Sequence, residues 1–326
     1  MTSKNLPRTI LIDTDTASDD AVALIMALQS PLVSVAAITV VAGNVSVEQA
    51  TRNALYTAEL CGSSVPIYTG AAQPLVRELQ TADWFHGVDG LGDHAYAPAI
   101  RRPEPEHAVD AIIQTVMQNP GIEVITLGPL TNVALALARE PRIAANISRC
   151  VVMGGAPCCE GNVTPAAEFN IWVDPEAART VFLSALPIEM IGWQLCRHQA
   201  ALNAQDIATI LALKTPRAEF AVRCNSRAAE AYHIQTGEHG ISLPDPIAMA
   251  ILLHPELSTS STMHFVEIET ASELTRGMTV VDRLGVVADL RNRNTWHEVQ
   301  TRGRKTKVCW SLDIPGWKAA LLDALR

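Results

Sequence analysis

Four aspartates lie within eight consecutive positions near the start of the chain: Asp13, Asp15, Asp19 and Asp20. Carboxylates this close repel one another, which costs free energy unless a cation or a reaction uses their charge. Helix capping by Ser18 or Asp19 would account for one or two acidic groups, but it leaves Asp13 and Asp15 without a role. The spacing therefore predicts a site for a hard cation or for general base chemistry.

Three kinds of acidic site fit this spacing to different degrees. An EF-hand loop counted from Asp13 would need Gly where the chain has Ser18 and Glu where it has Leu24. A phosphotransferase with an Asp-x-Asp nucleophile would need a later lysine and a second acidic pair, and the sequence offers no convincing set. The interpretation that remains is a metal-assisted hydrolase, in which acidic groups hold a cation and activate water.

The elements around the cluster predict where it lies. Thr9–Ile12 has the apolar run of a buried strand, whereas residues 21–28 are too long and too rich in Ala for a strand and predict a helix. Similar alternation of strands and helices continues to about residue 215, and strands and helices of a different pattern follow. We expect one domain over residues 1–326, of α/β class, with a Rossmann-like, mainly parallel sheet flanked by helices and a smaller C-terminal α+β elaboration.

Polar groups follow several of the predicted strands. Because the carboxyl ends of parallel strands share one edge of a sheet, these groups should converge on one crevice. They include Asn44, Asn132, Asn162, Glu168 and Asn170. Carboxylate and amide oxygens without a basic cluster suit a hard cation and a neutral polyol such as a sugar, and suit a phosphate poorly.

Composition excludes several classes of partner. The net charge of -9 argues against nucleic acid or an anionic membrane as a partner. No apolar run approaches the roughly 20 residues of a membrane span, and residues 1–8 lack the apolar region of a secretory signal. The seven cysteines are odd in number and form no Cys-x-x-Cys pattern, so we expect reduced thiols and a cytoplasmic location.

The motifs together resemble the inosine-uridine-preferring nucleoside hydrolase family over nearly the whole chain. The first matching segment is DTDTASDDAVAL at residues 13–24. Further matches follow in the family's order at residues 41–45, 86–92, 127–132, 153–155, 161–163, 167–178, 245–250 and 277–282.

The resemblance implies calcium-dependent hydrolysis of the N-glycosidic bond of a ribonucleoside, in purine or pyrimidine salvage. By position, calcium would be held by Asp15, Asp20, Asp245 and the main-chain carbonyl of Leu127. Asp15 would also act as general base on the attacking water.

The family's other matching positions have implied roles too. Asp13 would support the metal ligands from behind. The ribose would be held by Asp19, Asn44, Asn162, Glu168 and Asn170. The implied partners are a small-molecule nucleoside and further copies of the chain, in a homodimer or homotetramer.

Two departures from the family pattern concern the turn and the leaving base. Thr16 and Ala17 replace a Pro-Gly pair, so the turn must use ordinary backbone angles or strain a non-glycine residue. Pro244 replaces a His that is thought to protonate the leaving base in well-known members, and proline has no donor. The candidates for the base side are His86, Trp193, His233 and His239, although a surface His or a core Trp is an ordinary finding.

Two other functions stay open at this point. The same calcium site would suit another N- or O-riboside, which Pro244 makes plausible. A catalytically silent nucleoside- or sugar-binding protein is the second alternative, and the presence of every expected metal and base carboxylate weakens it.

Overall fold

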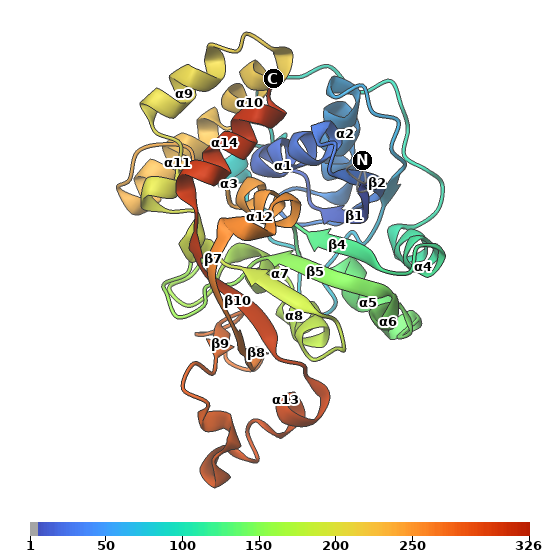
Figure 1. The fold of residues 1–326 in the computed structure, drawn as a ribbon, viewed down its shortest axis with the longest axis vertical. Coiled ribbons are helices and arrows are strands. Elements are labelled where there is room, and N and C mark those ends of the chain that lie inside the picture. The colour runs from blue at the N-terminus through green and yellow to red at the C-terminus, as the bar shows by residue number, and fades with distance from the viewer. Residues whose placement is uncertain (1–5) are drawn as a thin grey trace, which may run out of the picture.

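The computed structural model describes residues 6–326, so most of the N-terminal segment predicted to lack a secretory signal lies outside it. An eight-stranded sheet has the order β3-β2-β1-β4-β5-β6-β10-β7 (Figure 1). All neighbouring strands are parallel except β7, which runs antiparallel to β10. The strands are β1 (Arg8–Thr14), β2 (Val33–Val40), β3 (Ile67–Thr69), β4 (Ile122–Thr126), β5 (Ile147–Met153), β6 (Ile188–Ile191), β7 (Ser258–His264) and β10 (Thr306–Leu312).

Helices cover both faces of the sheet (Figure 1). Alternate strand residues point to opposite faces, so Ile10 and Ile12 enter one core while Leu11 enters the other. The first core contains side chains of α1 (Ser18–Gln29), α2 (Val47–Leu60), α9 (Ala204–Leu211), α10 (Pro216–Arg223), α11 (Ser226–Thr236), α12 (Pro244–Leu253) and α14 (Ile314–Ala324). The second contains side chains of α4 (Ala108–Gln118), α5 (Thr131–Arg139), α6 (Ile143–Asn146), α7 (Phe169–Val173) and α8 (Pro175–Phe182). The predicted α/β class with a mainly parallel sheet is confirmed.

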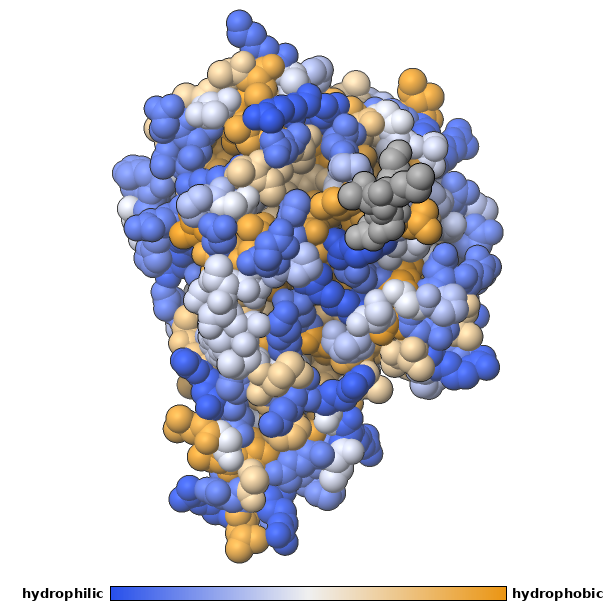
Figure 2. Space-filling view, viewed as in Figure 1, coloured by the Kyte–Doolittle hydropathy of each residue, from blue (hydrophilic) through white to orange (hydrophobic). Residues whose placement is uncertain are grey.

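The C-terminal part joins the main sheet more closely than the sequence predicts. β10 pairs with β6, and β7 adds an edge strand whose Ser- and Thr-rich sequence gave no apolar signal. A separate two-stranded sheet is formed by β8 (Val266–Ile268) and β9 (Thr279–Val281), beside α13 (His297–Arg302) at the lower end of Figure 1. Figure 2 shows a mainly hydrophilic face with some apolar residues in this lower part, where Leu284 and Leu290 are exposed.

The sequence pattern predicts one helix over roughly residues 217–231, but the structure has two helices there, α10 and α11. The chain breaks between α10 and α11 at Cys224 and Asn225, where the Asn225 amide donates to the carbonyl oxygens of Ser18 (3.2 Å) and Ala221 (2.9 Å). This break depends on a contact with the distant α1, so local periodicity could not predict it. In the described range, no helix is long and apolar enough to cross a membrane.

Charged side chains form a connected row at the sheet edge away from the acidic cluster. Glu189 accepts from Arg149 (2.7 Å) and pairs with Lys307 (2.9 Å). Glu123 pairs with Arg8 at 2.9 Å. Arg8 and Arg149 also donate to the last carbonyl groups of α12, including that of Leu252. The row therefore ties the sheet to the C-terminal end of the helix that carries Asp245.

Candidate active site

The acidic cluster lies in the turn between β1 and α1. β1 ends at Thr14, and α1 begins at Ser18. The prediction that Ser18 or Asp19 caps the helix was wrong, because Ala17 is the N-cap residue and its N–H donates to the Asp20 carboxylate at 2.9 Å. Ala17 has φ -103° and ψ -155°, so the turn without Pro-Gly uses ordinary backbone angles.

Three buried carboxylates lie close enough to share one cation. Asp19 and Asp20 come from the first turn of α1, and Asp245 comes from the first turn of α12, which packs beside α1 (Figure 1). Their ligand oxygens lie within 4.8 Å of one another. Thr14 donates to Asp20 at 2.5 Å, which orients that carboxylate.

Asp15 lies beside this trio and is held by the backbone of two other strand ends. The N–H of Asn44 donates to Oδ2 at 2.6 Å, while Oδ1 is buried and has no protein partner. A Cβ on Gly43 would lie 2.1 Å from Oδ2, and one on Gly128 would lie 2.6 Å from Oδ1. Only glycine therefore leaves room for this carboxylate at both positions.

Burial makes the ionised form of this cluster costly. It raises the pKa of Asp19 and Asp20 to about 6, with Asp19 adding to the effect on Asp20. Burial, and then the charge of Asp20, raise the pKa of Asp15 and of Asp245 well above the usual range. Within residues 6–326, no lysine or arginine pairs with these four carboxylates. Oxygen donors without a counter-charge, including the unpartnered Asp15 Oδ1 and Asp19 Oδ1, fit a hard divalent cation.

Asp13 lies behind the cluster on β1. Its Oδ1 accepts from Thr39 at 2.6 Å and from the Asn132 amide at 2.9 Å. Burial raises the pKa of Asp13 to about 7, although these two hydrogen bonds lower it in part. Asn132 also donates to the carbonyl of Val40, so Asp13 helps to join the ends of β1 and β2 to α5.

Three of the predicted sugar-binding residues, Asn162, Glu168 and Asn170, lie in the segment from β5 to α7, whereas Asp19 belongs to the acidic trio. Glu168 caps α7 and accepts from the N–H groups of Asn170 (2.9 Å) and Gly155 (2.8 Å). Asn170 donates to the carbonyl of Leu127 at 2.7 Å, so two predicted site groups are in contact. Asn162 accepts from the N–H of Phe169 at 2.9 Å.

These groups surround a cavity of about 620 Å³, much of it open to solvent. The predicted residues that line it are Asp19, Asn44, His86, Leu127, Asn162, Glu168, Asn170, Trp193 and Asp245. The sequence therefore predicted half of the residues that line the cavity. Asn44 and Leu127 among them follow strands, whose carboxyl ends meet at one edge of a parallel sheet. Pro244 also lines the cavity.

His233 and His239 are not among the lining residues. Their rings stack on each other, with centroids 3.9 Å apart, and His233 contacts the carbonyl of Glu238. Gln235 of the same segment does line the cavity and contacts the carbonyl of Asn162. No pattern in the sequence distinguishes Gln235 from its neighbours.

A further part of the cavity lining is largely apolar. Sequence analysis missed most of it, including Trp84, Phe85, Val163, Phe169 and Ser242. Trp193 is buried and packs edge-to-face on Tyr232, with ring centroids 6.4 Å apart. His86, from the short α3 (Asp83–His86), is buried as well, and burial lowers its pKa to about 4. A cavity lined by aromatic, acidic and amide side chains suits a ligand with a flat base and a sugar.

The chain is similar in sequence and fold to nucleoside hydrolases. It is 40% identical to the pyrimidine-specific ribonucleoside hydrolase RihA of Shewanella woodyi, over 94% of this chain and 99% of that protein. Its fold matches a plant nucleoside hydrolase, PpNRh1, with a TM-score of 0.88 and 31% identity, covering 98% of this chain and 99% of the other. A purine-preferring ribonucleoside hydrolase from Gardnerella vaginalis matches with a TM-score of 0.86 and 29% identity, covering 98% of both chains.

A family profile also matches the chain, over a range that includes all the residues that line the cavity. The profile described as inosine-uridine preferring nucleoside hydrolase matches residues 10–319, from β1 to α14. The segments that bring the buried aspartates, the strand-end amides and the aromatic wall together all lie inside this range, so the chain belongs to the inosine-uridine preferring nucleoside hydrolase family of ribonucleoside hydrolases.

Proposed function

We propose that the chain hydrolyses the N-glycosidic bond of a ribonucleoside to ribose and free base at the acidic cavity, with one calcium ion. Ribonucleoside hydrolysis is the activity of its family. The observation that carries the proposal is the group of buried aspartates without a counter-charge, two of which line the same cavity as amide and carboxylate groups that suit ribose hydroxyls.

The proposed calcium ligands are carboxylate oxygens of Asp15, Asp20 and Asp245 and the carbonyl oxygen of Leu127. When bound, calcium would supply positive charge that offsets the carboxylates and lowers the pKa of a coordinated water. Asp19 belongs to the closest trio of carboxylates, so it competes with Asp15 for this role. The calcium affinities of Asp15→Asn and Asp19→Asn test which of the two residues binds the ion, because the affinity should fall more when a ligand is replaced.

Asp15 is the proposed general base. The N–H of Asn44 fixes Oδ2, so Oδ1 stays free to accept the proton of the attacking water. The oxygen of that water then bonds to the anomeric carbon, and the electron pair of the broken glycosidic bond leaves with the base.

The sugar-side residues stabilise the positive charge that develops on the ribose. Glu168 is fixed by three main-chain N–H groups, from Gly155, Asn170 and Ile171. A fixed carboxylate gains more from an oxocarbenium-like ribose than from the neutral substrate, so it lowers the barrier. Hydrogen bonds to the 2′-hydroxyl would make the enzyme prefer ribosides to 2′-deoxyribosides.

A substrate panel tests the proposal. Purine and pyrimidine ribonucleosides, with matched 2′-deoxy analogues, are assayed for reducing sugar before and after calcium is stripped. We expect calcium-dependent release of reducing sugar from a ribonucleoside and much slower release from its deoxy analogue. The ribonucleoside that is cleaved fastest identifies the preferred base. If the folded, calcium-loaded protein releases nothing from any of them, ribonucleoside hydrolysis is wrong for this chain, and the alternative of another riboside takes its place.

A further inference from the structure

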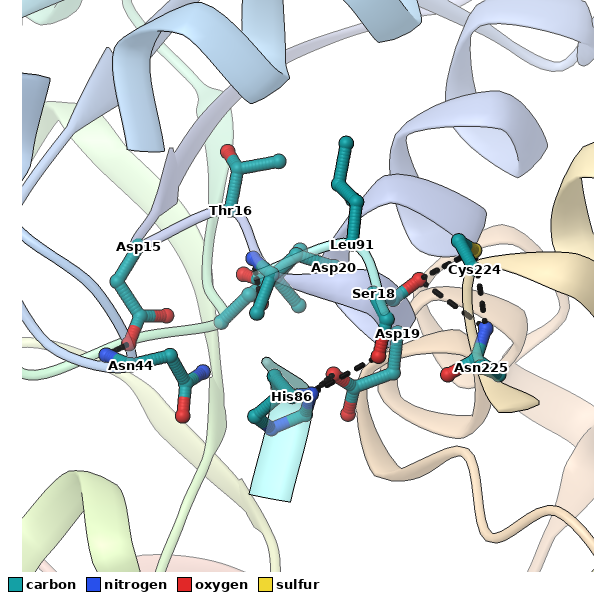
Figure 3. A network of polar contacts seen from close by, with 12 residues as sticks. Asp15, Thr16, Ser18, Asp19, Asp20, Asn44, His86, Leu91, Cys224 and Asn225 are labelled. Atoms are coloured by element: carbon teal, nitrogen blue, oxygen red, sulfur yellow. Dashed lines mark hydrogen bonds and ion pairs between the residues drawn. The ribbon is translucent and has the colours of Figure 1, made fainter. Parts of the chain in front are cut away.

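His86 is held from one side by a serine that the acidic cluster does not use. The hydroxyl of Ser18 lies 2.8 Å from Nδ1 of His86, as Figure 3 shows. Ser18 is fully buried at the start of α1, and His86 is 6% exposed at the end of α3. The hydrogen bond therefore joins two short segments at the edge of the cavity.

The surroundings of the Ser18 hydroxyl determine which atom donates. A buried hydroxyl needs an acceptor for its proton, and within residues 6–326 its one hydrogen-bond contact is Nδ1 of His86. The nearest oxygen of Asp19 is 3.8 Å from Nδ1, too far for a hydrogen bond. Ser18 therefore donates to Nδ1, which leaves the proton of the neutral imidazole on Nε2.

Nε2 has no protein partner in the described part of the chain, and His86 lines the cavity. In Figure 3 the ring edge that carries this atom is turned away from Ser18 and Asp19. The same cavity is lined by Pro244, which offers no donor beside Asp245. An N–H at Nε2 is therefore available to a hydrogen-bond acceptor on the leaving base.

We propose that Ser18 is a positioning residue, which holds His86 with its proton on Nε2 and directs this N–H toward the leaving base. This inference rests on the proposed function. As the glycosidic bond breaks, its electron pair stays on the base, and the N–H stabilises that charge through a ring nitrogen or carbonyl oxygen. His86 keeps its proton, and the released base takes one from solvent.

The position of Ser18 is itself fixed from the other side. Its carbonyl oxygen accepts from the Asn225 amide at 3.2 Å and from the Cys224 thiol at 3.5 Å. These residues form the break between α10 and α11. Figure 3 shows both side chains beside Ser18. The contact keeps the start of α1 in place, so the direction of the hydroxyl does not depend on the hydrogen bond to His86 alone.

Nitrogen NMR tests the tautomer without any activity measurement. The calcium-loaded protein is labelled with ¹⁵N-histidine, and His86→Gln identifies the signals of His86. We expect an unprotonated Nδ1 and a protonated Nε2 at neutral pH in the wild-type protein. A protonated Nδ1 would overturn the proposal.

Kinetics test the consequence for the leaving group. Ser18→Ala should lower kcat on a natural ribonucleoside roughly five- to tenfold, the effect of about one hydrogen bond. It should leave turnover of p-nitrophenyl riboside nearly unchanged, because nitrophenolate leaves without help. Ser18→Thr keeps the hydroxyl and should restore most of the activity.

A matched control and a double variant complete the test. Ser226→Ala removes another serine–histidine hydrogen bond, to the half-buried His94 at 2.9 Å, and should leave the turnover of both substrates unchanged. Adding Ser18→Ala to His86→Gln should cost nothing further if the two residues act together. Equal losses on both substrates after Ser18→Ala, or a full further loss in the double variant, would contradict the positioning role. A wild-type protein that cleaves no riboside at all would instead contradict the proposed function.

Discussion

The carboxylate of Asp15 packs directly against the backbone of Gly43, so that a Cβ at residue 43 would lie 2.1 Å from Oδ2. The next N–H along the chain, that of Asn44, donates to the same oxygen at 2.6 Å. Gly43 has no side chain, so the Asp15 carboxylate fits against its backbone. The N–H of Asn44, after the end of β2, then orients Asp15, the proposed general base. The position of Asp15 therefore requires glycine at residue 43.

Gly43→Ala should therefore displace Asp15 and lower kcat/KM by at least about a hundredfold, comparable to losing a general base. Gly62→Ala is a suitable control, because no atom lies within 4 Å of its Cβ position and the cost is that of a positive φ alone. The control should lose roughly 1 kcal/mol of stability and keep its kcat/KM. Wild-type activity in a folded Gly43→Ala protein would show that Asp15 is not held as described.

The metal-free protein should become less stable as pH rises from 5 to 7.5. The folded-state pKa is about 6 for Asp19 and Asp20 and about 7 for Asp13, and it is raised well above the usual range for Asp15 and Asp245. In the unfolded chain these groups titrate near 3.9. A raised folded pKa gives stability that is complete below the unfolded value and is lost as pH rises through the folded value.

His86 has the opposite effect on stability. Its pKa is about 4 in the folded protein and near 6.5 in the unfolded chain, so its contribution rises with pH between these values. The five aspartates together outweigh this one group. Thermal unfolding across pH 5 to 7.5, with a chelator or with excess calcium, checks the prediction. Calcium should reduce the loss of Tm at the higher pH, since it favours the ionised carboxylates. A chelated protein whose Tm rises steadily with pH would contradict it.

The charged row at the far sheet edge should matter for stability and not for catalysis. The Glu189 side chain is 4% exposed and pairs with Arg149 and Lys307. Glu189→Ala leaves both cations without this partner and should cost roughly 3 kcal/mol in the free energy of unfolding. The control is Glu140, a half-buried residue paired with the exposed Arg142, and its replacement by Ala should change the free energy of unfolding little. Chemical unfolding and kcat measure the two effects separately.

Gln235 should affect substrate binding more than turnover. It lies at the end of α11, lines the cavity and donates to the carbonyl of Asn162 on the sugar side. Gln235→Ala removes a bridge across the cavity, so KM should rise several-fold while kcat changes less. The neighbouring Ile234 is 77% exposed, and Ile234→Ala should alter neither constant. A selective loss of kcat would assign Gln235 to the chemical step instead.

The sequence predicted the cavity best where strand ends supply its residues. Asn44 and Leu127 line the cavity and each follow a strand, and parallel strands bring such positions to one edge by topology alone. Asp15 also follows a strand, but it is not among the lining residues and lies behind them, in contact with the N–H of Asn44. Gln235 and the Ser18–His86 pair depend on contacts between helices far apart in the chain, which no local pattern encodes. The single-domain organisation, the homo-oligomeric state and the cytoplasmic location stay predictions.

Asp15→Asn gives the most direct test of the central claim, that the buried carboxylates form a hydrolytic centre with Asp15 as general base. The variant keeps the size of the side chain and removes the base. Bound calcium, thermal unfolding and kcat on the ribonucleoside found in the substrate panel are measured on the same preparation. The account predicts a folded protein whose kcat falls by roughly two to four orders of magnitude even when calcium is restored. A folded, calcium-loaded Asp15→Asn protein with near-normal turnover would contradict it.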